Sequence, residues 1–294
     1  MGVADVVPGV SGGTIAFISG IYEELVTSLK SINIAALKQL FRGKIAEFFK
    51  TINGFFLLSV FGGVAISIFS LARIMKWLLL NHPIIVWSFF FGLILSSSVF
   101  VLRAAGRLKV PEWIAFVAGI ATAWLITTVS PATTPETWWF IILSGAIGIC
   151  AMILPGISGA FILLLLGKYL FIITAVSDLN IPVILLFIAG AAVGLILFSN
   201  LLGWLLKNHH SVTISLLSGF MIGSLRKVWP WKIPTEVMEN THGELIIITE
   251  KNVLPDTFMA DGYGEPLIAA AVAMFVTGII IMVILQKAGK KSEA

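Results

Sequence analysis

Long apolar runs separated by short polar loops dominate the chain. Six of them have roughly the twenty mostly apolar residues that cross a bilayer as a helix, and they lie at about 54–80, 83–102, 112–130, 181–206, 211–226 and 266–286. Two further apolar stretches, about 6–29 and 138–176, are interrupted by sequences rich in proline and glycine. The pattern predicts an all-α polytopic membrane protein in which two apolar stretches are broken.

The composition agrees with a membrane protein and narrows its chemistry. Hydrophobic residues make up 58% of the 294 residues and charged residues 12%, whereas soluble domains average about 45–50% and about 25%. The net charge of +4 is small and dispersed, so we expect no nucleic-acid partner. The single cysteine, Cys150, excludes disulfide scaffolds and thiolate metal clusters, and the four histidines suggest no metal site. We expect neither a metal nor a cofactor.

Basic residues alternate between loops and predict the orientation. Lys and Arg gather in loops 30–50 and 103–109, at Lys207 and in the C-terminal tail. Loops 131–137 and 177–180 contain none, and loop 228–265 is acidic. Because cytoplasmic loops accumulate Lys and Arg, we expect a multi-pass protein with a cytoplasmic C-terminus and an extracytoplasmic 228–265 loop. We read that loop as a connector, with a lid as the alternative, and its ELIIITEKN segment as a small strand.

The sequence repeats at an offset of half its length. Residues 4–33 align without gaps to 151–180, and ten of the thirty pairs are identical. Further matches occur at an offset of 127, pairing Trp77, Asn81, His82 and Gly92 with Trp204, Asn208, His209 and Gly219. We therefore divide one membrane domain, 1–294, into repeats 1–130 and 138–286, each a re-entrant helical hairpin followed by three transmembrane helices. Three crossings per repeat invert the second relative to the first, as in many secondary transporters.

Both interrupted stretches contain the same short motif, PGVSGG at 8–13 and PGISGA at 155–160. Proline ends the preceding segment, and the glycines permit a positive φ, so successive N–H groups can form an anion-binding concavity at the start of the next helix. We predict that the two motifs together bind a phosphate or carboxylate through Gly9, Ser11, Gly12, Gly13, Thr14, Gly156, Ser158, Gly159 and Ala160. The alternative is that the motifs are kinks whose glycines allow close helix packing.

Three charged residues are further candidates for function. Asp5 lies beside the first motif, where its carboxylate can bind a coupling proton or Na⁺. Arg73 and Lys168 lie near predicted outer helix ends, where they either attract an anionic headgroup or anchor the helix at the interface.

The two motif segments, ADVVPGVSGGTIAFISGIYEELV and ILPGISGAFILLLLGKY, resemble the paired signatures of the bacterial polyprenyl-phosphate transporter family. The resemblance implies a flippase-like carrier in the bacterial cytoplasmic membrane. Its cargo would be undecaprenyl phosphate, the lipid that carries cell-wall precursors, returned from the outer to the cytoplasmic leaflet. The implied partners are this lipid phosphate and the surrounding bilayer lipids.

Two other functions fit parts of the sequence. The motifs alone also suit a carrier of a small soluble anion. A lipid-phosphate phosphatase would need a general acid, base or nucleophile with an orienting partner, and no His–carboxylate pair converges on either motif, so we expect no enzyme. Inward movement of a phosphate opposes a negative-inside potential at roughly 2.3 kcal/mol per charge per 100 mV, and this cost predicts coupling to protons or Na⁺.

Overall fold

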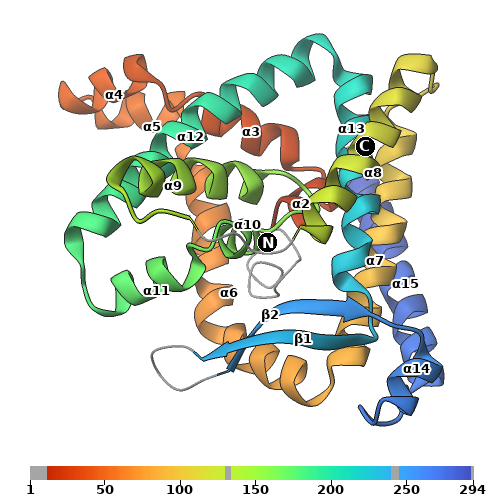
Figure 1. Cartoon of the computed structure of the whole chain (residues 1–294). Helices are drawn as coiled ribbons and strands as arrows, with labels where there is room; N and C mark the ends of the chain where they lie inside the picture. Colours follow the sequence, from red (N-terminus) through yellow and green to blue (C-terminus); the bar gives the residue numbers. More distant parts are fainter. Residues whose placement is uncertain (1–11, 130–133, 240–244, 293–294) are drawn as a thin grey trace.

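The computed structural model describes residues 12–129, 134–239 and 245–292 (Figure 1). Within this part the chain is helical apart from one antiparallel pair of strands. The first-half helices are α2 (Gly12–Ile18), α3 (Tyr22–Lys30), α4 (Ile34–Phe41), α5 (Ile45–Thr51), α6 (Gly54–Asn81), α7 (Pro83–Ala104) and α8 (Val110–Thr128). The later elements are α9 (Trp138–Ile153), α10 (Gly159–Leu165), α11 (Tyr169–Ser177), α12 (Ile181–Asn208), α13 (His210–Ser224), the 3-10 helix η1 (Leu225–Val228), β1 (Lys232–Glu239), β2 (Leu245–Asn252), α14 (Pro255–Ala260) and α15 (Ile268–Ser292).

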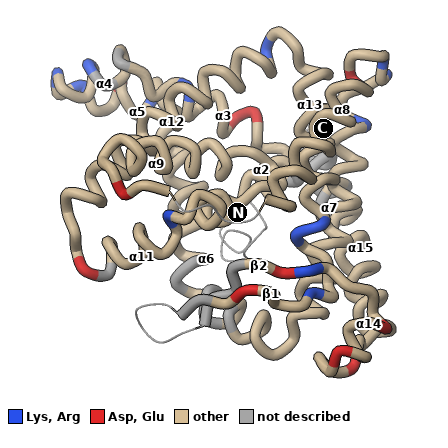
Figure 2. Tube along the Cα trace, in the orientation of Figure 1, with Lys and Arg blue, Asp and Glu red and all other residues tan. Residues whose placement is uncertain are grey.

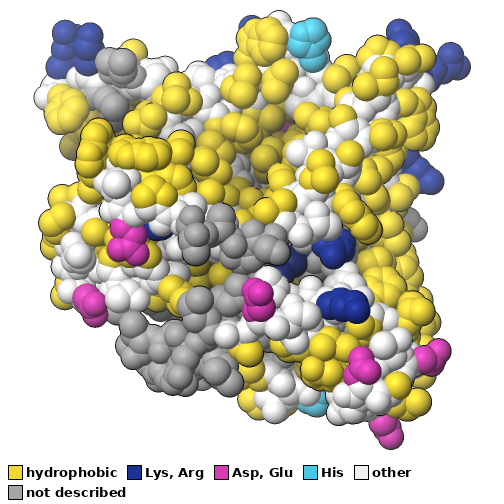
Figure 3. Space-filling view, in the orientation of Figure 1, with side chains coloured by type: hydrophobic (Ala, Val, Ile, Leu, Met, Phe, Trp, Pro, Cys, Tyr) yellow, Lys and Arg dark blue, Asp and Glu magenta, His cyan; other side chains and the backbone are white. Residues whose placement is uncertain are grey.

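Several helices are long and apolar enough to cross a membrane. In the described residues α7, α8 and α12 qualify individually, and the number rises to five if two bent pairs each count as one span. These pairs are α5 with α6, bent by 76°, and α10 with α11, bent by 113°. Large apolar side chains are exposed on α6, α8, α12 and α15, and they cover much of the surface in Figure 3. An apolar surface of this kind suits contact with lipid, and together with the long apolar helices it is compatible with a polytopic membrane protein.

The structure corrects some of the predicted boundaries. Helices occur in all six predicted crossing regions, but α13 has 15 residues before η1 begins, fewer than a full span needs. The basic 30–50 loop contains α4 and α5, which sequence periodicity did not reveal because both are short. The 228–265 loop contains two strands where we expected one, and the helix α14.

The two broken stretches end their short helices in the same way. After α2, Gly20 has φ +76°, and the amides of Gly20 and Ile21 donate to the carbonyls of Phe17 and Ala16. After α10 the same bonds occur 147 residues later, with Gly167 at φ +62°. Glycine is favoured at both places because a left-handed residue closes the helix end without a Cβ penalty.

Two helix pairs pack closely through glycines. A Cβ on Gly92 of α7 would lie 2.1 Å from the carbonyl oxygen of Phe275 in α15, and one on Gly219 of α13 would lie 2.1 Å from that of Phe116 in α8. The helix backbones are therefore in direct contact, as small residues allow in membranes. Gly92 and Gly219 are partners in the sequence repeat, so corresponding glycines form corresponding contacts.

The ends of these helices fix their directions. Lys232 of β1 lies over Trp87 near the start of α7, with Nζ 3.7 Å from the ring centroid, whereas α13 leads into β1 through η1. Arg226 in η1 donates to the carbonyl of Thr127 near the end of α8, and Trp231 Nε1 donates to Pro266 before α15. Thus α7 and α15 begin, and α8 and α13 end, at the end of the molecule that carries the strands. We call this the β-hairpin end.

Charge divides the molecule along the same direction. Figure 2 shows most Lys and Arg at the end opposite the strands, on α4 and α5 and around the starts of α8 and α13. We call this the basic end. Asp and Glu lie mostly toward the β-hairpin end, where a small group of basic residues accompanies them (Figure 2). The largest buried cluster lies between these ends and includes Ala16, Tyr22, Ile94, Leu217 and Met221 from α2, α3, α7 and α13.

Candidate functional site

The two motif regions meet inside the molecule. The backbone N–H of Gly156, in the turn between α9 and α10, donates to Thr14 Oγ1 on α2 over 2.8 Å. Tyr22 on α3 reaches the same turn, since its hydroxyl donates to the carbonyl oxygen of Ile153 over 3.1 Å. Both bonds are buried and join residues more than 130 positions apart. The turn of the second motif is therefore in direct contact with the segment that follows the first motif, a contact that we call the motif junction.

Gly156 is required in this junction for two reasons. Its φ is +90°, which residues with a Cβ rarely adopt. A Cβ there would also lie 2.8 Å from Ser224 Oγ and 3.0 Å from the carbonyl oxygen of Phe220, both on α13. The turn thus contacts α2 through a hydrogen bond and α13 through direct packing.

The rest of the second motif starts α10. Ser158 stands at the N-cap position in an extended conformation, and its side chain makes no capping hydrogen bond. Gly159 is buried against α9, because a Cβ on it would lie 2.6 Å from the carbonyl oxygen of Gly148. Ala160, by contrast, is exposed. Gly159 therefore permits close packing within the α9–α10 hairpin, which is the structural role that the alternative reading gave it.

The first motif is described only in part. Gly12 and Gly13 are buried at the start of α2, and Thr14 follows them with a fully buried side chain. The candidates Asp5, Gly9 and Ser11 lie outside the described residues, and so does the side chain of Arg73. Their predicted roles stay predictions.

Lys168 occupies a different environment from either predicted one. Its side chain is buried at the break between α10 and α11, and Nζ donates to the carbonyl oxygen of Thr134 over 2.8 Å. The rings of Phe140 and Phe171 lie 5.8 Å and 5.4 Å from Nζ. This ammonium holds the break against the segment before α9, so we do not include it in the proposed phosphate site.

A second polar region lies at the β-hairpin end and was not predicted as a group. Arg226 and Lys227 of η1 lie beside Lys232 of β1 and Glu250 of β2 in a pocket of about 340 Å³. One signal was present in the sequence, because the pair Arg226-Lys227 directly precedes the 228–265 loop, in which acidic residues outnumber Lys232 and Lys251. The contribution of Lys232 and Glu250 depends on the register of the two strands, which the sequence pattern did not specify.

Comparisons with known proteins identify the family. The model of a family described as undecaprenyl phosphate translocase-like matches residues 1–246. The chain belongs to this family. A polyprenyl-phosphate transporter of Vibrio cholerae is 46% identical over 258 residues, covering 88% of this chain and 84% of that protein. A polyprenyl-phosphate transporter of Staphylococcus aureus is 31% identical over 258 residues, covering 81% and 86%. No solved structure gave a significant match.

The family membership confirms the resemblance seen in the paired motifs. It is a family of transporters, so the chain is a transporter and not an enzyme. The matched region contains both motifs and most of the helices, and it ends within β2.

Proposed function

We propose that the protein transports polyprenyl phosphate across a bacterial cytoplasmic membrane and binds the phosphate where its two motifs meet. The cargo is supported by the names of the relatives in V. cholerae and S. aureus. The observation that carries the site is the buried hydrogen bond from Gly156 of the second motif to Thr14, the residue that follows the first motif.

The junction offers hydrogen-bond donors without a fixed positive charge. Thr14 Oγ1 accepts the Gly156 amide, and a threonine hydroxyl can also donate, here to a phosphate oxygen. The side chain of Ser158 does not cap α10, and the first backbone N–H groups of this short helix add donors and its positive end. In a site of low dielectric these bonds are stronger than in water. A neutral site of this kind binds an anion and still allows its release.

The helix directions support two inverted repeats around this junction. Partners in the sequence repeat, α7 with α13 and α8 with α15, run oppositely between the basic end and the β-hairpin end. We infer that the motifs are approached from opposite leaflets, with the basic end in the cytoplasm. The carrier would receive spent lipid phosphate at the β-hairpin end and release it at the basic end.

The proposal is tested by transport in proteoliposomes with Thr14 variants. Thr14→Val keeps the shape of the side chain but removes the acceptor of the Gly156 amide. Leaving a buried donor unpaired costs about 1–3 kcal/mol, so we expect uptake of a labelled polyprenyl phosphate to fall at least tenfold. Thr14→Ser retains the hydroxyl and should retain most of the activity. The measurement is initial uptake at equal amounts of folded, reconstituted protein.

The same assay separates the proposed cargo from a small soluble anion. A lipid carrier moves polyprenyl phosphate and is insensitive to a moderate excess of inorganic phosphate. Uptake of inorganic phosphate without movement of the lipid would assign the protein to soluble anions instead. Equal lipid uptake by wild type and Thr14→Val would show that the motif junction does not bind the phosphate.

A further inference from the structure

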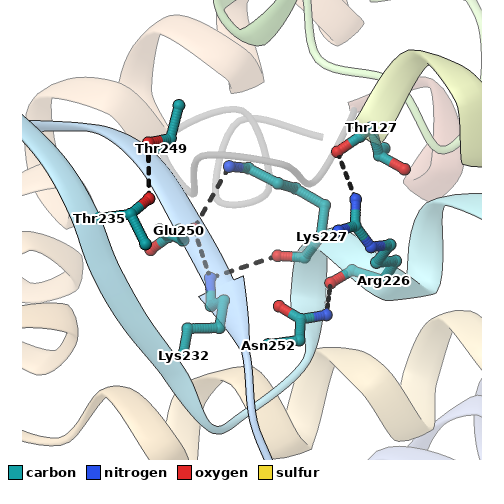
Figure 4. A network of polar contacts seen from close by, with 8 residues as sticks. All are labelled: Thr127, Arg226, Lys227, Lys232, Thr235, Thr249, Glu250 and Asn252. Carbon is teal, nitrogen blue, oxygen red and sulfur yellow. Dashed lines mark hydrogen bonds and ion pairs between the residues drawn. The ribbon is translucent and has the colours of Figure 1, made fainter. Parts of the chain in front are cut away.

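The pocket at the β-hairpin end has more positive charge than its own residues neutralise. It is formed by η1, the two strands, the end of α8 and one side of α10, and Figure 4 shows the polar residues contributed by η1, the strands and α8. Of the residues that the structure describes, four cationic side chains line it (Arg226, Lys227, Lys232 and Lys251), against the two carboxylates of Glu236 and Glu250, which gives these residues a net charge of +2. Figure 3 shows basic side chains gathered beside the strands on a face that is otherwise largely apolar.

One carboxylate is shared by two of these cations. Glu250 Oε2 lies 3.3 Å from Lys227 Nζ and 3.2 Å from Lys232 Nζ, as Figure 4 shows. Charge-assisted hydrogen bonds between an ammonium and a carboxylate usually measure about 2.7–2.9 Å, so neither lysine is tightly paired with Glu250. The oxygen of Glu250 marks a point at which both ammonium groups converge on one anionic atom.

Burying the ammonium group of Lys232 costs free energy unless enough negative charge lies beside it. The side chain of Lys232 is 5% exposed and lies on the face of Trp87. Burial lowers the pKa of Lys232 to about 8, and the charge of Glu250 offsets only part of that effect. A buried ammonium is stabilised by any additional negative charge placed beside it. A doubly charged anion would neutralise the net charge of the pocket.

Another part of the pocket lining is apolar. Phe161 and Leu165 of α10 and Val129 after α8 line it, and the Phe161 ring centroid lies 4.7 Å from Lys227 Nζ. Phe161 is also two residues beyond Gly159, so the pocket adjoins the second motif. A volume of about 340 Å³ equals that of about ten water molecules, which leaves room for a phosphate and the first part of an attached apolar chain.

We propose that this pocket is an entry site for the phosphate monoester headgroup of a lipid, bound by Lys227, Lys232 and Arg226 with its apolar chain along α10. A phosphate monoester carries about −1.5 to −2 charges at pH 7, which matches the excess in the pocket. The role as an entry site rests on the proposed transport function. From here the headgroup moves a short way along α10 to the motif junction, because Gly156 packs on the last turns of α13, which lead directly into η1.

The test measures binding to the purified full chain in nanodiscs of zwitterionic lipid. A short-chain prenyl phosphate is the probe, and inorganic phosphate and the corresponding prenyl alcohol are its comparisons. Lys227→Gln removes one cation, so we expect the Kd of the prenyl phosphate to rise about tenfold. At pH 6, below the pKa of Lys232, Glu250→Gln removes the competing carboxylate, so we expect the Kd to fall about threefold or more. Lys207→Gln, an exposed lysine at the basic end, is the matched control and should leave the Kd unchanged.

Opposite effects of the two pocket variants distinguish an anion site from a structural ion pair. If the lysines only held the strands in place, both variants would lower thermal stability and neither would tighten binding, and this result would overturn the proposal. Should Glu250→Gln fail to fold, an unchanged Kd in Lys227→Gln would overturn it alone. Equal affinity for inorganic phosphate and prenyl phosphate would exclude the lipid as the specific ligand.

The outcomes also separate this site from the transport function. Transport that persists with Kd and KM unchanged in both pocket variants refutes the entry site and leaves the proposed function intact. Binding that follows the predicted order in a protein that does not move the lipid refutes the proposed function and leaves the pocket as a phosphate monoester site.

Discussion

At the scale of single residues, the turn at Gly156 combines backbone strain with close packing, and the two contributions can be separated. We expect Gly156→Ala to abolish transport and to lower the free energy of unfolding by roughly 2–4 kcal/mol, because it adds both a left-handed residue with a Cβ and an overpacked contact. Gly106→Ala is the matched control: Gly106 has φ +81°, but no atom lies within 4 Å of its Cβ position. It should show only the cost of strain, about 1–2 kcal/mol, with transport preserved. Thermal unfolding in detergent and uptake in liposomes measure the two effects. Equal losses of stability and of transport in both variants would mean that the contact of Gly156 with α13 contributes to neither.

The lowered pKa of Lys232 predicts a pH dependence for anion binding at the β-hairpin end. Its folded pKa is about 8 because the amine is buried, whereas the ordinary value is about 10.4. Between these values the unfolded chain binds more protons than the folded one, so the contribution of Lys232 to stability increases as pH rises through this window. Anion binding changes in the opposite direction, since the ammonium is lost above pH 8. The Kd of a prenyl phosphate should therefore rise above about pH 8.

The charges of Glu250 and Lys227 beside Lys232 determine how the pH dependence of anion binding shifts in a variant. Glu250 raises the pKa of Lys232, whereas Lys227 lowers it. Burial alone would raise the pKa of Glu250, but the two lysines hold it below its ordinary range, so Glu250 stays charged throughout this range. Glu250→Gln should thus shift the onset of weaker binding to lower pH, as titration calorimetry across pH 6–10 would show. An onset at the same pH in wild type and variant would mean that Lys232 does not control the profile.

At the scale of elements, glycine contacts predict which helix pairs hold the fold together. Gly92→Ala would place a Cβ 2.1 Å from the carbonyl oxygen of Phe275, forcing α7 and α15 apart, and we expect a loss of about 1–3 kcal/mol. Gly219→Ala should cost a similar amount between α13 and α8, because its contact is equally close. Gly62→Ala on α6 is the control, since its Cβ would meet nothing within 4 Å. It should be neutral or stabilise by up to about 1 kcal/mol through helix propensity. A destabilisation by Gly62→Ala that matches the other two would argue against the packing explanation.

The sequence predicted those elements that are encoded by a continuous run of residues or by a motif that occurs twice. Apolar run length located the long helices to within a few residues, and the interruption predicted at PGISGA coincides with the turn between α9 and α10. The self-alignment paired Gly20 with Gly167 but did not predict the breaks at which these glycines end their helices with the same bonds. It did not locate the contact of Gly156 with Thr14, since nothing in either motif specifies that the turn of one reaches the hydroxyl after the other. The pocket was missed for a similar reason: Glu250 faces Lys232 only through the strand register, and a short loop segment carries no periodicity that reveals it. Short helices such as α4 were missed because eight residues hold little more than two turns of signal.

At the scale of the whole molecule, carrying a phosphate between the two ends is a movement of charge through the membrane field. The phosphate of the proposed cargo carries about −1.5 to −2 charges, so entry against a negative-inside potential of 100 mV costs roughly 3–5 kcal/mol. At equilibrium an uncoupled carrier would therefore leave the lipid roughly 300- to 2,000-fold less concentrated in the inner leaflet than in the outer one. We expect an inward proton or Na⁺ gradient to increase net uptake, and an inside-negative potential to have little inhibitory effect while that gradient lasts.

Asp5→Asn, which removes the candidate coupling carboxylate beside the first motif, should abolish the stimulation of uptake by the gradient. It should preserve exchange of lipid between leaflets in the absence of a gradient. The measurement is net uptake into liposomes whose ion gradients and potential are set independently with ionophores. Uptake that ignores both gradients, or stimulation that survives Asp5→Asn unchanged, would place the driving force elsewhere than in an ion bound at Asp5.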